Sequence, residues 1–176
     1  MKRILAPQST VVLAVAALVF TVGFGATMAW AANLQFNQAS VTRSNENLVC
    51  TFKITGLGDN GRVNVECSAD ADATYGCINK GGKNPSAANK QEETGRVSAE
   101  GLFNSDKNGS VTGSLTVSPP PTTLSCPSGQ VLRLCAVTYS AIQLFAEGVS
   151  GSATGQDDTE AVSGTFTFDA GIAGCP

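Results

Sequence analysis

Positive charge is concentrated in one stretch, "CINKGGKNPSAANK", which spans residues 77–90. Its Gly81-Gly82-Lys83 segment is similar to part of a phosphate-binding loop. That motif, however, needs an earlier glycine, a Ser or Thr after the lysine, and a following helix. Asn84-Pro85 follows instead, and nothing there indicates a helix. The stretch is therefore interpreted first as a structured surface loop, in which asparagines satisfy the backbone through Asx-type turns.

The same loop also carries a weak binding hypothesis. Its lysines form a local basic patch on an acidic protein, and such a patch attracts an anionic polymer or an acidic partner. The candidate binding residues are Asn79, Lys80, Lys83, Asn84 and Lys90.

Most catalytic and metal-binding chemistry is excluded by residue type. The chain has no His, which removes Ser-His-Asp and Cys-His relays, a histidine general base and histidine metal ligands. Cysteines held in disulfides provide neither a nucleophile nor a thiolate ligand. The motifs "SDKNG" and "GQDDTE" contain oxygen ligands for calcium but do not match the spacing of a calcium loop. We therefore predict no enzyme activity, no metal site and no cofactor.

Paired carboxylates leave one catalytic alternative, a small glycosidase. Asp157, Asp158 and Glu160 cluster, but they lie in a stretch rich in Gly, Ser and Thr that is predicted to be a mobile loop. A catalytic pair needs fixed spacing and a pKa shifted by burial. Asp70 and Asp72 share the polar face of a predicted strand, where solvated surface residues are the simpler interpretation.

Residues 1–31 are predicted to be a secretory signal peptide. Lys2 and Arg3 give a positive start, an uncharged apolar run follows, and Ala29-x-Ala31 fits the small-residue pattern that signal peptidase recognises. Cleavage would leave one secreted domain, residues 32–176, that is either released or retained at the cell surface. An uncleaved membrane anchor is the alternative, because the apolar run is long enough to span a bilayer.

The composition of the predicted mature part narrows its partners. It contains no His, Met or Trp, and nine basic residues stand against 14 acidic ones, a net charge of −5. This acidic balance with scattered charge argues against binding to nucleic acid or to an anionic membrane surface. Sugar platforms usually use Trp or Tyr faces, and only Tyr75 and Tyr139 remain, so a stacking lectin is disfavoured.

All six cysteines follow the leader, and an even number in an exported chain indicates three disulfides. The first two face each other if a hairpin folds about Gly58-Asp59. The third ends a long strand and the fourth follows a proline run, so a bridge between them would pin one large loop to another. The last pair follows by elimination. The predicted pairs are Cys50–Cys67, Cys77–Cys126 and Cys135–Cys175.

Alternating polar and apolar residues predict strands along the mature chain. The clearest is "RVNVECSADADATY", 62–75, with one parity buried. "QVLRLCAVTYSAIQLF", 130–145, is apolar on both parities and is predicted to be a central strand with a bend. Turn residues predict two hairpins, one between the first two cysteines and one joining 97–104 to 110–118. The other predicted strands cover 33–43, 47–56 and 161–171, and the large predicted loops cover 76–95 and 149–164.

Together these strands predict the fold class. No stretch after the leader keeps a helical apolar period over three turns. About seven or eight short strands with Gly, Asn and Pro turns predict an all-β, disulfide-stapled β-sandwich of immunoglobulin-like type.

Three segments resemble small exported bacterial proteins. The pattern YxCxNxGGxxPxAxNK is matched from Tyr75 to Lys90, KNGxVTGSL from Lys107 to Leu115, and CPxGQ from Cys126 to Gln130. The resemblance implies secretion and a β-rich fold, and it implies no activity.

These observations lead to a functional hypothesis. We predict a non-catalytic secreted protein that acts by contact with a protein or with an envelope polymer. The alternative is a structural component of the cell surface that self-associates into homo-oligomers through an exposed strand edge. A membrane is a partner only if the leader is retained.

Overall fold

The computed structural model describes residues 33–81, 89–172 and 175, all within one compact unit, Ala31–Pro176. The predicted signal peptide, residues 1–31, lies outside the described residues. Within the described ranges, no helix has the length and apolar character needed to cross a membrane.

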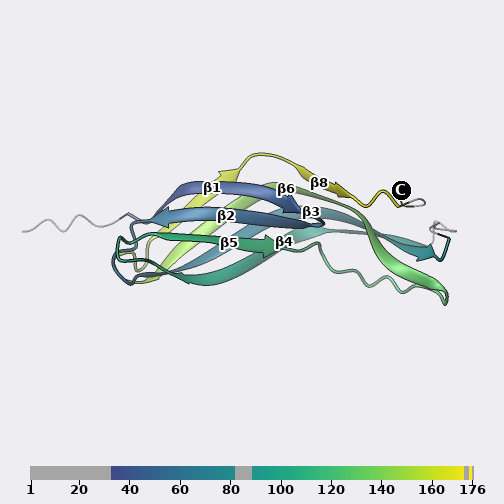
Figure 1. Ribbon diagram of the computed structural model, residues 1–176, viewed down its shortest axis with the longest axis horizontal. Coiled ribbons are helices and arrows are strands. Elements are labelled where there is room, and N and C mark those ends of the chain that lie inside the picture. The colour runs from purple at the N-terminus through teal and green to yellow at the C-terminus, as the bar shows by residue number, and fades with distance from the viewer. Residues whose placement is uncertain (1–32, 82–88, 173–174, 176) are drawn as a thin grey trace, which may run out of the picture. The chain divides into compact units, whose positions relative to one another are not determined.

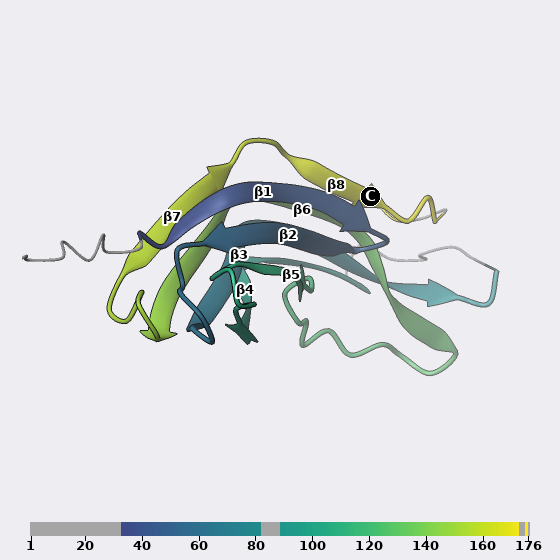
Figure 2. The same cartoon turned by 60° about the vertical axis from the view of Figure 1, so that its left-hand side comes forward.

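Eight strands form two antiparallel sheets that pack face to face (Figure 1 and Figure 2). The smaller sheet has the order β1-β2-β5, and the larger has the order β4-β3-β6-β7, with β8 also paired to β6. Two antiparallel sheets that pack face to face and carry three disulfides have the architecture of the predicted immunoglobulin-like sandwich, so the predicted fold class is confirmed. The strands are β1 Gln35–Ser44, β2 Asn47–Thr55, β3 Arg62–Asn79, β4 Lys90–Asn104, β5 Val111–Val117, β6 Gln130–Ser150, β7 Asp157–Val162 and β8 Phe166–Asp169.

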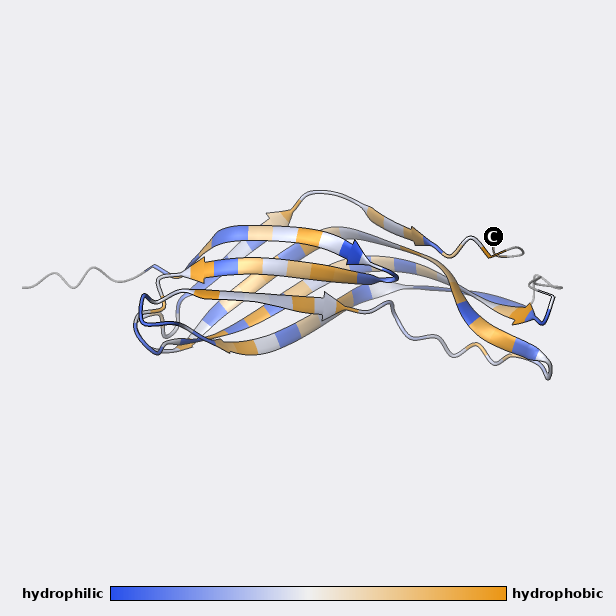
Figure 3. Ribbon diagram, in the orientation of Figure 1, coloured by the Kyte–Doolittle hydropathy of each residue, from blue (hydrophilic) through white to orange (hydrophobic). Residues whose placement is uncertain are grey.

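The hydrophobic core lies between the two sheets. Polar and apolar residues alternate along most strands (Figure 3), and the apolar ones point inward. On β3, the buried apolar residues from Val63 to Ala73 share one parity, while Asp70 and Asp72 are exposed on the other. The predicted alternation over 62–75 is therefore confirmed. We call the side of the larger sheet that points away from the smaller sheet its outer face.

Both predicted hairpins are wrong. β2 pairs with β1 and β5, whereas β3 pairs with β4 and β6, so Cys50 and Cys67 lie in different sheets. In the same way, β4 pairs with β3 but β5 pairs with β2. The connections at 56–61 and 105–110 cross between the sheets, and both are longer than a usual hairpin loop of about two to five residues.

Three disulfides join the same cysteines that the sequence pairs. Cys50–Cys67 links the two sheets through the core, with a Cα–Cα distance of 6.4 Å. The other two pairs each have a Cα–Cα distance of 5.4 Å. The Cys50–Cys67 pair was predicted correctly from a hairpin that does not exist. Both cysteines point into the core, and they do so whether β2 and β3 pair with each other or lie in different sheets. The other two bridges are Cys77–Cys126 and Cys135–Cys175.

β6 is the bent central strand that the sequence predicts. It pairs with β3 along one side and with β7 and β8 along the other. Ser140 pairs with Asp70 and Gln143 with Ser68, so Ala141 and Ile142 face a single residue of β3. This is a β-bulge, and Ala141 has a positive φ of 47° at this point.

Two predicted loops are in part strands. β3 continues to Asn79 and β4 begins at Lys90, so the predicted loop 76–95 is shorter than expected. β7 occupies part of the predicted mobile loop 149–164 and pairs with Ile142–Glu147 of β6. The predicted strand 161–171 is divided between the end of β7 and β8.

Both tyrosines of the chain donate their hydroxyl groups to backbone carbonyl oxygens. Tyr75 bonds to Pro120 at 2.6 Å, and Tyr139, which is fully buried, bonds to Glu46 at 2.9 Å. Burial raises the pKa of both phenols above their ordinary value. The negative charge of Glu93 adds to the rise in the pKa of Tyr75.

We expect the folded protein to form much less tyrosinate at about pH 10 than the denatured chain, in which tyrosine is half ionised there. Because the pKa of each phenol is higher in the folded state than in the denatured chain, the protonated phenols stabilise the folded protein. This stabilisation is complete below about pH 10 and is lost as the pH rises through the pKa values of the folded state. An alkaline titration tests this: ultraviolet absorbance measures the fraction of tyrosinate, and circular dichroism measures the fraction of folded protein. Half ionisation near pH 10 in a still folded protein would contradict the expectation.

Candidate functional site

One end of the larger sheet extends past the smaller sheet. In both views β3 and β6 continue beyond the ends of β1, β2 and β5 (Figure 1 and Figure 2). We call this extension the arm and define it as residues 74–79 of β3, 90–93 of β4 and 130–134 of β6. Cys77 and Ile78 are buried there, yet they are not part of the sandwich core cluster. The arm is therefore a separate element of the surface.

The inner face of the arm is covered by the segment 118–129, which we call the strap. The strap contains the proline run and has no regular secondary structure. Besides the Tyr75–Pro120 hydrogen bond, Gln91 Nε2 donates to Thr123 Oγ1 at 3.2 Å, and Cys126 is bonded to Cys77. One covalent bond and two hydrogen bonds thus hold the strap against β3 and β4.

The outer face of the arm carries a row of positive charge. Gly76 pairs with Lys90 of β4 on one side and with Arg133 of β6 on the other. Directly paired residues point to the same face of a sheet, and two strand spacings separate their Cα atoms by about 10 Å. Gly76 is itself buried and has no side chain, so no side chain stands between the two cations in this row. We call these three residues the cationic row.

The cationic row contains one residue that the sequence analysis missed. Lys90 was a candidate, but Arg133 lies 43 positions further along the chain, and only the pairing of β6 with β3 brings it to the same row. Arg133 is exposed, and Lys90 is half-buried. Glu92, two residues after Lys90 on β4, points to the same face and is negative. The positive charge on this face is therefore limited to the end of the arm.

The other predicted binding residues are only partly described. Asn79 ends β3, and its Oδ1 accepts a hydrogen bond from the Gly81 N–H at 3.0 Å, as expected for an Asx-type turn. Lys80 follows it and is exposed. Lys83 and Asn84 lie outside the described residues. Asn89 Nδ2 donates to Gln130 Oε1 at 3.0 Å, which ties the start of β4 to the start of β6.

Apolar side chains are also exposed on the arm. Val131 is 54% exposed and Leu132 is 39% exposed, and an apolar band near the start of β6 is visible in Figure 3. Val131 pairs with Ile78 of β3. Ile78 is two residues after Gly76 and therefore shares its face, so Val131 lies on the outer face with the cationic row. A large apolar side chain that remains exposed beside cations is typical of a contact surface.

The acidic candidates have structural contacts. Asp158 Oδ2 accepts a hydrogen bond from the Phe36 N–H at 2.7 Å, and Oδ1 accepts one from the Thr159 N–H at 2.9 Å. Asp158 thereby joins β7 to β1 at the edge of the sandwich. Asp157 and Glu160 are exposed on β7. In the described residues, no group of three or more His, Cys, Asp or Glu side chains could hold a metal ion.

Asp70 takes part in a polar network on the outer face. Arg96 Nη1 lies 3.1 Å from Asp70 Oδ1, and both side chains are about half exposed. Arg96 Nη2 donates to Ser68 Oγ and to Gln143 Oε1, each at 2.8 Å. The guanidinium therefore reaches across β3 to β6, and the network fits the predicted solvated strand face.

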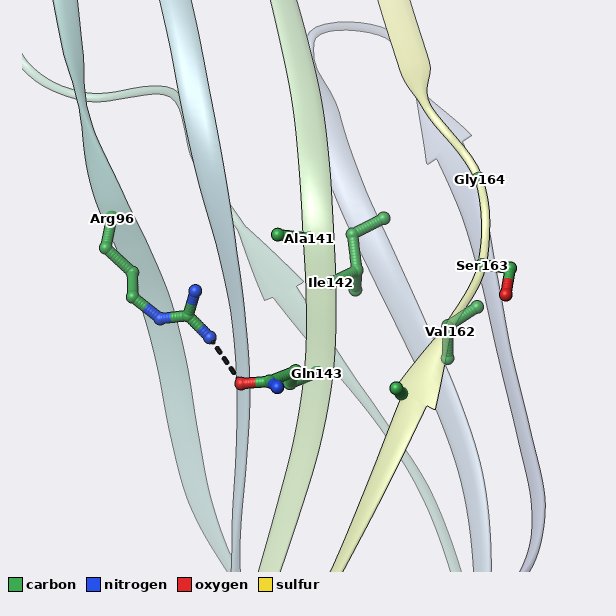
Figure 4. A pocket seen from close by; sticks show the side chains of 8 residues that line it. Arg96, Ala141, Ile142, Gln143, Val162, Ser163 and Gly164 are labelled. Carbon is green, nitrogen blue, oxygen red and sulfur yellow. Dashed lines mark hydrogen bonds between the residues drawn. The ribbon is translucent and has the colours of Figure 1, made fainter.

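A shallow notch lies beside this network (Figure 4). It forms where the bulge at Ala141 faces the break between β7 and β8, near Ser163 and Gly164. In the described pairings, Ala141 has no cross-strand partner. The notch is thus the local consequence of the extra residue in β6, and Arg96 at its rim is already paired with Asp70.

The solved structures that match this chain include two of low similarity. The sporulation control protein Spo0M from Bacillus subtilis is 11% identical over 74% of this chain, with a TM-score of 0.31. The chain spans only about half, 48%, of the length of that structure. CsgH from R. palustris is 14% identical over 77% of this chain and 91% of its own, with a TM-score of 0.22. No protein-family model and no curated protein matches the chain. At this level of similarity, neither structure bears on the function.

Proposed function

We propose that this protein is exported and acts without catalysis, by contact between the outer face of the arm and an anionic partner at the cell envelope. The partner is an anionic polymer or an acidic protein surface. The observation that carries the proposal is the cationic row, in which Lys90 and Arg133 flank Gly76.

The surroundings of the row support a contact role. Exposed Val131 on the same face adds apolar area that contact with a partner would remove from water. The strap and the Cys77–Cys126 bridge support the opposite side of the arm, so the row is held in place before binding. Preorganisation of this kind reduces the ordering cost of association.

Export and the lack of catalysis belong to the same proposal. Export rests on the leader pattern and on cysteine pairing that suits an oxidising compartment. A non-catalytic role rests on residue types: the chain has no His, and Asp158 is engaged with the backbone of β1.

The test is a sedimentation assay with envelopes from the producing cells, using the protein purified with its disulfides intact. We expect Lys90→Glu combined with Arg133→Glu to weaken binding on the order of a hundredfold, because two charge-assisted contacts of about 1.5 kcal/mol each are lost. Binding of the unaltered protein should also fall as salt rises.

The matched control reverses two exposed cations elsewhere, with Arg62→Glu and Lys107→Glu. It changes the net charge equally but leaves the arm intact, so its binding should match that of the unaltered protein. Equal losses in both variants would show a general charge effect and refute a specific role for the arm. Sedimentation of the protein without envelopes would instead favour self-association.

A further inference from the structure

The turn between β4 and β5 contains the sequence Asp106-Lys107-Asn108-Gly109-Ser110. Asn-x-Ser, with any residue except proline in the middle, is the acceptor pattern for N-linked glycosylation of exported proteins. The turn lies where β4 ends and β5 begins, whereas the arm contains the start of β4. It is therefore at the opposite end of β4 from the cationic row.

Backbone and carboxylate contacts fix the conformation of this turn. Asp106 Oδ1 accepts hydrogen bonds from the N–H groups of Asn108 and Ser110, both at 2.9 Å. The Gly109 N–H donates to the Asp106 carbonyl oxygen at 3.0 Å. Gly109 has φ +71°, and a Cβ there would lie 2.6 Å from the Gly58 nitrogen. The glycine at the middle position is thus required by the turn.

The two side chains of the acceptor pattern remain available. Asn108 is exposed, and its side-chain amide makes no hydrogen bond to the described part of the chain. The Ser110 hydroxyl likewise has no partner among the described residues. Both residues line one open hollow together with Asp106 and Thr112. The amide that would be modified and the hydroxyl that identifies it therefore face the same accessible space.

Other asparagines lack this combination. Asn84 is followed by proline and then Ser86, and proline in the middle position excludes it as an acceptor. Asn60-Gly61-Arg62 is also an exposed Asn-Gly turn, but it has Arg where the pattern needs Ser or Thr. Across the sequence, Asn108 alone has the complete pattern.

We propose that Asn108 is the acceptor of an N-linked glycan, added in the export compartment by an oligosaccharyltransferase from a lipid-pyrophosphate-linked sugar donor. Asn108 Nδ2 attacks C1 of the sugar, the C1–N bond forms, and the C1–O bond to the pyrophosphate breaks. Nδ2 loses one proton, and the lipid pyrophosphate leaves. The glycan extends from the end of the sandwich away from the arm, so it leaves the cationic row uncovered.

The experiment is mass analysis of the protein isolated from its own cells, first intact and then as peptides. We expect an added carbohydrate mass on the peptide that contains Asn108. The added mass should disappear completely in Asn108→Gln and in Ser110→Ala, and it should persist in the control Asn60→Gln. Because the first measurement uses the unaltered protein, it does not depend on the folding of any variant.

Spontaneous deamidation also changes Asn in Asn-Gly sequences and has to be distinguished. Enzymatic removal of the glycan in water labelled with heavy oxygen places that isotope on residue 108, whereas earlier deamidation leaves it unlabelled. An intact mass equal to that of the unmodified chain with three disulfides would overturn the proposal. Carbohydrate that remains in Asn108→Gln would overturn it as well.

Discussion

Replacing Cys50 and Cys67 together with alanine should lower the free energy of unfolding by about 3–5 kcal/mol. The bridge closes a loop with a sequence separation of 17 and links the two sheets through the core. Both sulfur atoms are fully buried, so the alanines also leave unfilled space, which adds to the entropic loss. Denaturant unfolding under oxidising conditions measures the change. Because small domains have total stabilities of about 5–15 kcal/mol, a large part of the population could unfold at raised temperature.

The matched variant removes Cys77 and Cys126, whose sequence separation is 49. Loop-closure entropy alone would make this second loss the larger one. We expect the opposite for the main unfolding transition, because this bridge holds the strap to the arm and lies outside the core cluster. Amide exchange should increase in the strap and arm while the sandwich keeps its protection. A larger fall in global stability for the second variant would contradict this.

The fold class and all three disulfide pairs could be predicted from the sequence, but the pairing of strands could not. An alternating strand shows one buried face whether it pairs with its neighbour in sequence or crosses to the other sheet. For that reason Cys50 and Cys67 were correctly paired from a wrong hairpin. Connection length was the neglected signal. The short turn at Asn45-Glu46 forms the hairpin of β1 and β2, whereas 56–61 and 105–110 cross between sheets.

The two missed strand segments are explained by their position in the sheet. The first half of β4, "KQEETGR", and most of β7, "DDTEAV", are rich in charged and polar residues. Both strands lie at edges of the larger sheet. Charged side chains are common on edge strands, where they oppose pairing with another chain. This composition removes the alternation by which strands are recognised, so both segments were interpreted as loops.

The candidate site was predictable only in part, for a related reason. Lys80 and Lys90 were found because they share one short stretch of sequence with the other lysines. Arg133 lies in an apolar strand and belongs to the cationic row only through its register with Gly76. The pairing of β3 with β6 contains three register shifts. Such a register cannot be counted from the sequence, because each extra residue shifts every later pair.

Deletion of single residues from β6 should show whether the fold requires the β-bulge at Ala141. Upstream of the bulge, Val137 and Tyr139 point into the core, whereas downstream the inward residues are Ile142 and Leu144, which have the other parity. Ala141 is the extra residue that separates the two sets. Deleting Ala141 should therefore leave both sets inward and convert the bulge to a regular ladder. We expect a folded protein within about 1 kcal/mol of the original stability, since the strain of a positive φ is removed.

The matched variant deletes Thr138, which is only a few residues away and also shortens β6 by one. If the bulge absorbs this deletion, Tyr139 turns outward and Ser140 turns inward. Tyr139 is the largest fully buried side chain among the described residues. Exposing it should cost about 3–5 kcal/mol, and its hydrogen bond to the Glu46 carbonyl is lost. Denaturant unfolding and amide exchange compare the two deletions. An equal loss of stability in both deletion variants would contradict this expectation. It would mean that the fold requires the bulge at Ala141 and its positive φ.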